Sequence, residues 1–125
     1  MDLIKTEGFD NVYEVKPFQK EFEKAVKKDK RYYKWLREKL AILEKLGMEA
    51  LKLESFEPLP STDPRLYSIR YPKSPINPRV IYIYANGKEV YLLTAFKESS
   101  KNSNSDYEAA IKVAEERLKY IGEYT

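Results

Sequence analysis

The side chains of this sequence best suited to chemistry are cations in its second half. Three short segments rich in aromatic and β-branched residues carry, at their ends or just beyond them, Arg70, Arg79, Lys97 and Lys101. Segments of this composition form strands, so the cations are expected at strand ends and edges, where a polyanion can reach them. Guanidinium and ammonium groups bind phosphate oxygens and stabilise negative charge that develops on them. We therefore expect a phosphate-rich ligand, and the hypothesis is RNA.

Residue types that are absent narrow the chemistry further. The chain has no cysteine and no histidine. Disulfide frameworks, thiolate zinc sites and the usual histidine ligands and general bases are thereby excluded. Catalytic triads, zinc hydrolases and thiol proteases are excluded with them. We expect no cofactor, no metal site and no small-molecule ligand.

Charge is sorted along the chain. The formal net charge is only +3, but residues 16–46 hold 11 Lys and Arg against 5 Asp and Glu, and residues 65–101 hold 7 against 2. A basic half-surface of this kind suits a phosphate backbone. For residues 16–46 the alternative of a solvated helix face stays open. The lysines concerned are Lys20, Lys24, Lys27, Lys28 and Lys34.

Length and hydropathy bound the architecture. With 125 residues the chain has room for one domain with one core, so a single domain over residues 1–125 is expected. Residues 1–9 lack the apolar run of a signal peptide. Nowhere do about 18 apolar residues follow one another, as a membrane-spanning helix requires. We expect a soluble cytoplasmic protein that does not bind membranes.

Apolar segments in the second half predict an antiparallel meander of three strands. They span residues 66–71, 79–84 and 90–97. Prolines punctuate the first connection, residues 72–78, and Asn86-Gly87 is a strong signal for a tight hairpin turn in the second. The tyrosines of these segments are expected to pack on the sheet as cross-strand aromatic neighbours. They are Tyr67, Tyr82, Tyr84 and Tyr91.

The first half predicts one strand and two helices. Residues 11–15 suit a short strand, and Pro17 suits the first turn of a helix that follows it. Apolar residues at helical spacing occupy residues 18–26 and again residues 32–46. Gly47 is expected to end the second helix with a positive φ. The two helices are expected to pack as a hairpin.

Two further segments complete the expected fold. Residues 48–65 contain three prolines and predict an irregular connection into the sheet. Residues 105–108 match a capping box that starts a C-terminal helix. The apolar positions of that helix are Ala109, Ala110, Val113, Ala114, Leu118 and Ile121. The expected class is α+β, with an N-terminal strand and a two-helix hairpin packed on an antiparallel sheet with a three-strand meander, plus the C-terminal helix.

Four short motifs follow one another in the second half of the chain. They are Leu66-Tyr67-Ser68-Ile69-Arg70, Pro78-Arg79-Val80-Ile81-Tyr82, Leu92-Leu93-Thr94-Ala95-Phe96 and Lys97-Glu98-Ser99-Ser100-Lys101. Their order and spacing resemble the RelE/ParE superfamily of toxins from type II toxin-antitoxin systems, most closely the HigB-like, phage-derived branch. The resemblance covers about residues 60–118 in sequence and the first half only in the order of its elements. It implies a RelE-like fold.

The resemblance also implies an activity. Toxins of this kind are endoribonucleases that cut messenger RNA, usually in the decoding site of the ribosome, and a cognate antitoxin, here expected to be of the helix-turn-helix type, silences them. Cleavage by attack of the ribose 2′-OH on the neighbouring phosphate needs a proton acceptor, a cation for the developing charge and a proton donor, but no metal. Lys and Arg can contribute to this chemistry. The antitoxin is expected to dock on the helical hairpin or on a sheet edge.

Individual roles follow from the same resemblance. Arg79 matches the family arginine expected to hold the scissile phosphate. Arg70 falls where relatives have a basic residue for proton transfer or phosphate contact, although an arginine is a poor general base because it keeps its proton. Lys97 and Lys101 match the Lys-rich tract that contacts phosphate or protonates the leaving group. Tyr107 has the spacing of a base-stacking tyrosine.

Structural roles and rival functions remain open at this stage. Relatives often have His or Asp near the end of the last strand, and Glu98 is the one carboxylate close to that position here. Arg79 can instead pair with a surface carboxylate, and Tyr107 can simply pack on the sheet. One rival function is a ParE-like toxin that inhibits a DNA topoisomerase. Another is a relative that binds nucleic acid or a partner without catalysis. The combination of Arg70, Arg79 and Lys97 favours the nuclease.

Overall fold

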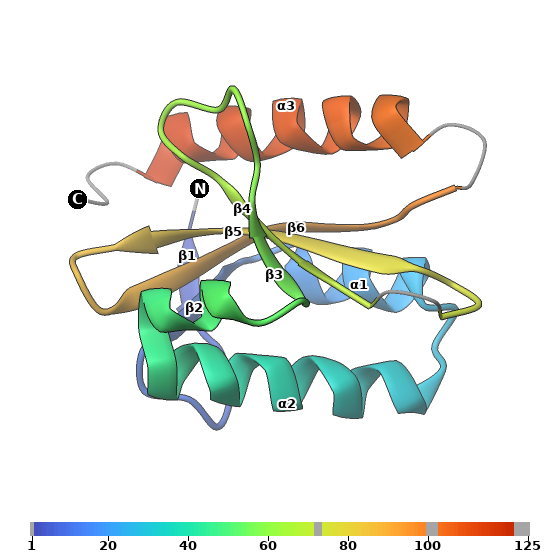
Figure 1. Cartoon of the computed structure of the whole chain (residues 1–125), viewed down its shortest axis with the longest axis horizontal. Coiled ribbons are helices and arrows are strands. Elements are labelled where there is room, and N and C mark those ends of the chain that lie inside the picture. The colour runs from blue at the N-terminus through green and yellow to red at the C-terminus, as the bar shows by residue number, and fades with distance from the viewer. Residues whose placement is uncertain (1, 72–73, 100–102, 122–125) are drawn as a thin grey trace.

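A central sheet carries helices on both of its faces, so the α+β class is confirmed (Figure 1). The computed structural model describes residues 2–71, 74–99 and 103–121. Its strands are β1 Leu3–Lys5, β2 Val12–Val15, β3 Phe56–Pro58, β4 Tyr67–Arg70, β5 Pro78–Ala85 and β6 Glu89–Lys97. Its helices are α1 Phe18–Ala25, α2 Lys30–Leu46, the short 3-10 helix η1 Gly47–Lys52 and α3 Ser103–Ile121. In Figure 1, α3 lies above the sheet while α1 and α2 lie below it.

The predicted meander is confirmed as the antiparallel run β4, β5 and β6. Asn86 and Gly87 form the turn between β5 and β6 with φ angles of 52° and 77°. The Asn-Gly pattern predicts this geometry because both residues tolerate positive φ. The six strands follow the order β1-β2-β6-β5-β4-β3.

A β-bulge interrupts the pairing of β5 with β6. Ile81 pairs with Thr94, but the next residue, Tyr82, pairs with Leu92, so the register skips Leu93. One extra residue in one strand changes which face the later side chains occupy.

The direction of β2 differs from the prediction. β2 lies beside β6 in parallel, with Val12 opposite Val90 and Glu14 opposite Leu92. The sheet is therefore mixed, and the expectation of an antiparallel sheet is wrong at this pair. Alternating apolar residues show that a strand has a buried face, but they carry no information on which strand lies next to it or in which direction.

Three short elements were not expected from the sequence. β1 pairs with β2 at one edge of the sheet, and β3 pairs with β4 at the other. η1 and β3 lie within residues 48–65, so the prediction of an irregular connection there is wrong in part. Strands of three residues are too short for a periodic pattern to indicate them.

The core forms where both faces of the sheet are covered. β5 and β6 are buried along most of their length, which explains their nearly continuous apolar sequences. The ring of Phe22 in α1 lies against Tyr33 and Trp35 of α2, so the two predicted helices are in contact. The four meander tyrosines pack as expected: Tyr67 stacks on Tyr82 and contacts Tyr84, while Tyr91 packs edge-on against Tyr13.

The C-terminal helix α3 departs from its prediction at both its start and its apolar face. It begins at Ser103, so Ser105 is not its N-cap, and the carboxylate of Asp106 accepts a hydrogen bond from Ser99 N at 2.7 Å instead. Its buried stripe consists of Ala110, Ala114 and Leu118, whereas Ala109 and Val113 are exposed. Within the described residues, no helix is long and apolar enough to cross a membrane.

An ion pair joins α3 to α1 across the edge of β6. Arg117 donates from Nη1 to Glu21 Oε1 and to Leu93 O, each at 2.7 Å, and from Nη2 to Glu21 Oε2 at 2.5 Å. Thr94 Oγ1 also donates to Glu21 Oε1, at 3.0 Å. Both charged side chains are largely shielded from solvent, so their mutual attraction is less screened than that of a surface pair.

Arg117→Ala removes the guanidinium from this contact and leaves the partly buried carboxylate of Glu21 without its counter-charge. We expect the free energy of unfolding to fall by about 3 kcal/mol, measured by urea denaturation. Lys119→Ala is the matched control, because its pair with Glu116 is exposed and is worth at most about 1 kcal/mol. Equal losses for the two variants would contradict the assignment.

Candidate active site

Two arginines face one another across neighbouring strands at one end of the sheet. Arg70 is the last residue of β4 and pairs in register with Arg79 of β5. Phe96 of β6 continues the row, and its ring contacts Tyr107, so this is the face that α3 covers. Like charges placed directly opposite in a sheet destabilise it. Such a pair therefore needs compensating negative charge or an anionic ligand.

Glu98 compensates Arg79. The Arg79 Nη2 group donates to Glu98 Oε2 at 2.8 Å, and Nη1 donates to Pro78 O at 3.0 Å. The side chains of Arg79 and Glu98 are only 7% and 19% exposed. The pairing with a carboxylate that was considered as the structural role of Arg79 is thus present, although it is buried rather than on the surface. It holds the guanidinium in one position.

Glu57 compensates Arg70 less tightly. The Arg70 Nε atom lies 3.9 Å from Glu57 Oε2, and both side chains are about a third exposed. Within the described part of the chain, the Nε atoms of Arg70 and Arg79 are buried without a hydrogen-bond partner. Buried donors are nearly always satisfied in folded proteins. A phosphate group that reaches this end of the sheet meets Arg70 first, because its side chain is the more exposed of the two.

Tyr107 of α3 joins the same face. Its ring packs edge-on against Phe96 with 5.1 Å between centroids, and its hydroxyl lies 3.3 Å from Ser68 Oγ. Burial raises the pKa of the Tyr107 phenol, although the hydrogen bond with Ser68 and the charge of Arg79 act in the opposite direction. The phenol therefore keeps its proton at neutral pH and can donate it.

A hollow lies beside Tyr107 and Glu57. It measures about 350 Å³. One side is formed by Glu57 of β3 and by Leu59 and Pro60, which follow β3, and the other side by residues of α3: Asn104, Tyr107, Glu108 and Ile111. Tyr107 thus packs on the sheet and also lines an open space. Both sequence interpretations of Tyr107, sheet packing and base stacking, are compatible with this position.

The structure does not group Lys97 with the arginines. Side chains alternate along β6, so Phe96 and Glu98 share the face of Arg79 while Lys97, which pairs with Pro78, starts on the opposite face. Lys97 is exposed at the end of the strand. Lys101 lies outside the described residues.

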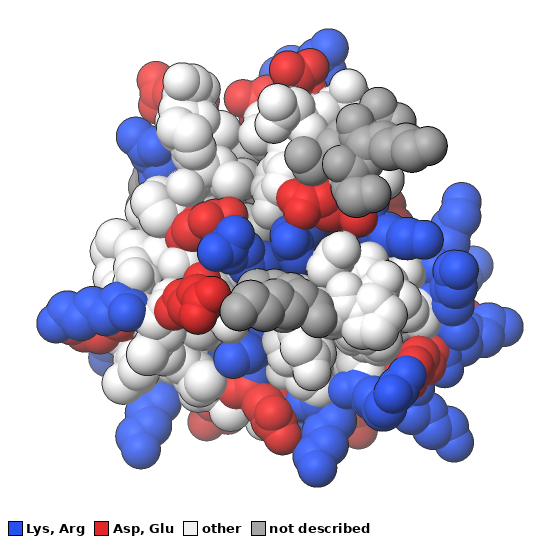
Figure 2. All heavy atoms as spheres, turned by 45° about the vertical axis from the view of Figure 1, so that its right-hand side comes forward, with Lys and Arg blue, Asp and Glu red and all other residues white. Residues whose placement is uncertain are grey.

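Charges of both signs surround this end of the sheet. Figure 2 brings the right-hand side of Figure 1 forward and shows basic and acidic side chains in contact near the middle of the face. Lys and Arg side chains project from its right and lower edges. The lysines of the α1 and α2 region that the sequence analysis singled out are all exposed. A polyanion approaching this end therefore meets a basic rim.

Sequence reasoning found one of the two carboxylates of the site: it noted Glu98 near the end of the last strand but missed Glu57. Glu57 lies in the segment expected to be irregular, and Ser68 reads as an ordinary strand residue. The sequence does contain one signal for the neighbours of Arg79. Counting residue pairs back from the Asn86-Gly87 turn places Arg79 opposite the last residues of β6. This count does not reveal the bulge, which decides which of those residues lies opposite Arg79.

Comparison with known proteins gives a family. Residues 20–119 match the family model described as Phage derived protein Gp49-like (DUF891). The chain belongs to this family. The sequence resemblance to a phage-derived branch agrees with this family description, and the Gp49-like family is consistent with a toxin-like role. No curated protein and no solved structure matches the chain.

Glu98→Gln removes the negative charge that balances Arg79 in the Gp49-like protein while keeping the shape of the side chain. Because Arg79 is buried, we expect the free energy of unfolding to fall by about 3 kcal/mol. Glu57→Gln removes the longer, half-exposed pair and is expected to cost less than about 1 kcal/mol. Urea denaturation of both variants measures the difference, and a larger loss for Glu57→Gln would refute this ranking.

Proposed function

We propose that this protein is the toxin of a toxin-antitoxin system, a RelE/ParE superfamily member of the HigB-like branch that acts as a metal-independent endoribonuclease on messenger RNA bound to the ribosome. The observation that carries the proposal is the register pair Arg70–Arg79, with two buried donors that find no acceptor among the described residues. Membership of the phage-derived Gp49-like family supports the toxin role.

The arginine pair would hold the scissile phosphate. Arginine presents several N–H donors in a planar fork that matches phosphate oxygens. In the reaction the ribose 2′-oxygen attacks the neighbouring phosphorus, the bond from phosphorus to the 5′-oxygen breaks, and a 2′,3′-cyclic phosphate and a 5′-hydroxyl result. The two guanidinium groups would stabilise the charge that builds up on the phosphate oxygens in this step.

Glu98 is the proposed proton acceptor. A carboxylate can take the proton of the 2′-OH, whereas the two arginines cannot, because they remain protonated. The ion pair with Arg79 fixes the Glu98 carboxylate beside the guanidinium that would bind the phosphate. Base and phosphate ligand would thus be positioned by one contact.

Tyr107 is the proposed donor to the leaving 5′-oxygen. It lies on the face of Arg79, and burial keeps its phenol protonated by raising its pKa. Lys97 starts on the other face of β6 and Lys101 lies outside the described residues, so for these two we propose contacts with the flanking phosphates of the RNA. Tyr107 would also be available to a nucleobase through the hollow that it lines.

The expected partners follow from the same proposal. They are a cognate antitoxin of the helix-turn-helix type, the messenger RNA and the ribosome, and the expected location is the cytoplasm. The exposed lysines Lys20, Lys24, Lys27, Lys28 and Lys34 would meet ribosomal RNA.

Induced expression of the wild type and of Arg79→Ala in a bacterial host tests the proposal. The wild type should arrest growth and produce new 5′ ends inside translated regions, and Arg79→Ala should lower cleavage by about 10²–10³-fold. Growth curves and 5′-end mapping of cellular messages measure both. Lys52→Ala is the matched control, because that lysine is 78% exposed on η1, outside both the arginine pair and the basic surface of α1 and α2, and should leave cleavage unchanged.

Arg79 is buried, so loss of folding has to be separated from loss of chemistry. Arg70→Ala, at a half-exposed position, should lower cleavage while circular dichroism shows an unchanged fold. Growth arrest with intact messages and a DNA-damage response would replace the nuclease with the topoisomerase inhibitor. Absence of any effect of the wild type would replace it with a binding protein that has no catalytic activity.

A further inference from the structure

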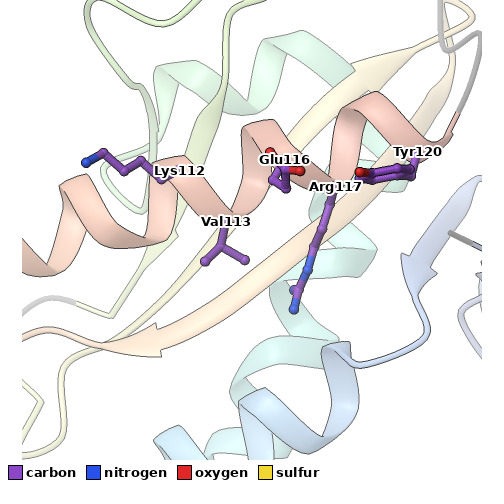
Figure 3. Close-up of a pocket in the computed structure, with 5 residues that line it drawn as sticks. All are labelled: Lys112, Val113, Glu116, Arg117 and Tyr120. Carbon is purple, nitrogen blue, oxygen red and sulfur yellow. The ribbon is translucent and has the colours of Figure 1, made fainter.

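The sheet does not cover all of the apolar residues of α3. The sequence pattern assigns Ala109 and Val113 to the apolar stripe of this helix, yet both are exposed, and Val113 retains 39% of its accessible surface. Figure 3 shows Val113 and Arg117 projecting from α3 on the side of β6, with Arg117 extending past the strand toward α1. Single exposed apolar residues are ordinary, so Val113 indicates a binding surface only together with the features that surround it.

Half of β6 lacks a neighbouring strand beside that surface. β2 pairs with β6 only at Val90–Leu92, and no other described strand lies on this side of β6. The carbonyl of Leu93 accepts a hydrogen bond from Arg117. From Thr94 to Lys97, no described strand pairs with this edge of β6. An open strand edge offers backbone donors and acceptors to an extended peptide.

These two features meet in one groove, which we name the edge groove. Its floor is the β6 edge from Thr94 to Lys97, and its walls are Ala25 of α1 and Val113 of α3. A hollow of about 470 Å³ occupies it, and further hollows that share Val113 extend it in both directions along α3. The walls are mainly apolar and the floor is backbone, which is the arrangement that binds a strand.

The charged side chains at the rim of the edge groove that have no partner described above are lysines. Lys24, Lys97 and Lys112 are exposed around it. The acidic groups at the groove are engaged within the protein: Glu21 binds Arg117, Asp106 accepts from Ser99 N, and Glu116 lies 3.4 Å from Lys119. An acidic peptide therefore complements the rim, and a basic one does not.

We propose that the edge groove binds an extended acidic segment of a partner protein, which adds to β6 as a strand in line with β2. The identity of that partner as the antitoxin rests on the proposed function. A segment bound in the edge groove would also lie close enough to the candidate active site to inhibit it. Lys97 ends the groove, and the next residue, Glu98, is the partner of Arg79, so the bound segment ends beside the arginine pair.

A displayed library of random eight-residue peptides, panned against the purified full chain, tests the edge groove without the antitoxin. Enriched peptides should be acidic with alternating apolar residues, and hydrogen exchange should slow at Thr94–Lys97 when they bind. N-methylation of alternate peptide amides should weaken binding at least tenfold, because it removes strand hydrogen bonds without altering the protein.

Variants of the protein provide the second arm. Val113→Asp, and Lys24→Glu combined with Lys112→Glu, should each weaken the enriched peptides at least tenfold. Met48→Asp is the matched control, since Met48 is an exposed apolar residue of η1, outside the groove, and should have no effect. Failure to enrich peptides on the wild type over Val113→Asp, or slowed exchange at another segment, would overturn the proposal.

The outcomes also separate this inference from the proposed function. Peptide binding at the groove by a wild type that neither arrests growth nor cuts messages would leave the groove in place and reject the toxin. A toxic wild type whose groove binds no peptide would do the reverse.

Discussion

The pairing of β5 with β6 is the contact on which the rest of the structure depends. These two strands lie at the centre of the sheet order and are buried on both faces. Every other large element packs on them or on a strand paired with them: α1 and α3 contact β6 from opposite sides, and β4 and β2 pair with their outer edges. The β5–β6 hairpin therefore positions both its parallel neighbour, β2, and its antiparallel neighbour, β4. The position of Arg79 is fixed by it too, since it lies near the start of β5.

Electrostatic balance is the second organising feature. Arg70 and Arg79 are opposed by Glu57 and Glu98, so the four groups carry no net charge in the free protein. The two halves of this cluster differ in strength, because the pair of Arg79 is short and buried and that of Arg70 is long and half-exposed. Arg70 is accordingly the side that yields more readily to an incoming anion, while Arg79 keeps its place. A site of this kind is preorganised on one side and adaptable on the other.

Sequence reasoning recovered what depends on local chemistry. The Asn86-Gly87 turn, the meander and the helices after Pro17 and before Gly47 were all predictable, because each has a backbone or periodicity requirement that single residues reveal. The parallel pairing of β2, the short strands β1 and β3, and the place of Glu57 beside Arg70 were not. They depend on contacts between segments far apart in the chain, such as Glu57 with Arg70. Lys97 was grouped with Arg79 through the family resemblance and its place at a strand end, neither of which shows the face that a side chain occupies.

That face is decided by the bulge at Leu93. With an unbroken register from Tyr82 opposite Leu92, Arg79 would stand opposite Ala95 rather than Phe96, and alternation would bring Lys97 to its side and turn Glu98 away. The bulged residue Leu93 thus determines which side chain lies beside Arg79: the anionic Glu98 and not the cationic Lys97. Without the bulge, Lys97 would take the place of Glu98 and change the net charge of the cluster from zero to +2, because Arg70, Arg79 and Lys97 would then be opposed by Glu57 alone. Relatives with and without this bulge would have the same residues but a different charge at the arginine pair.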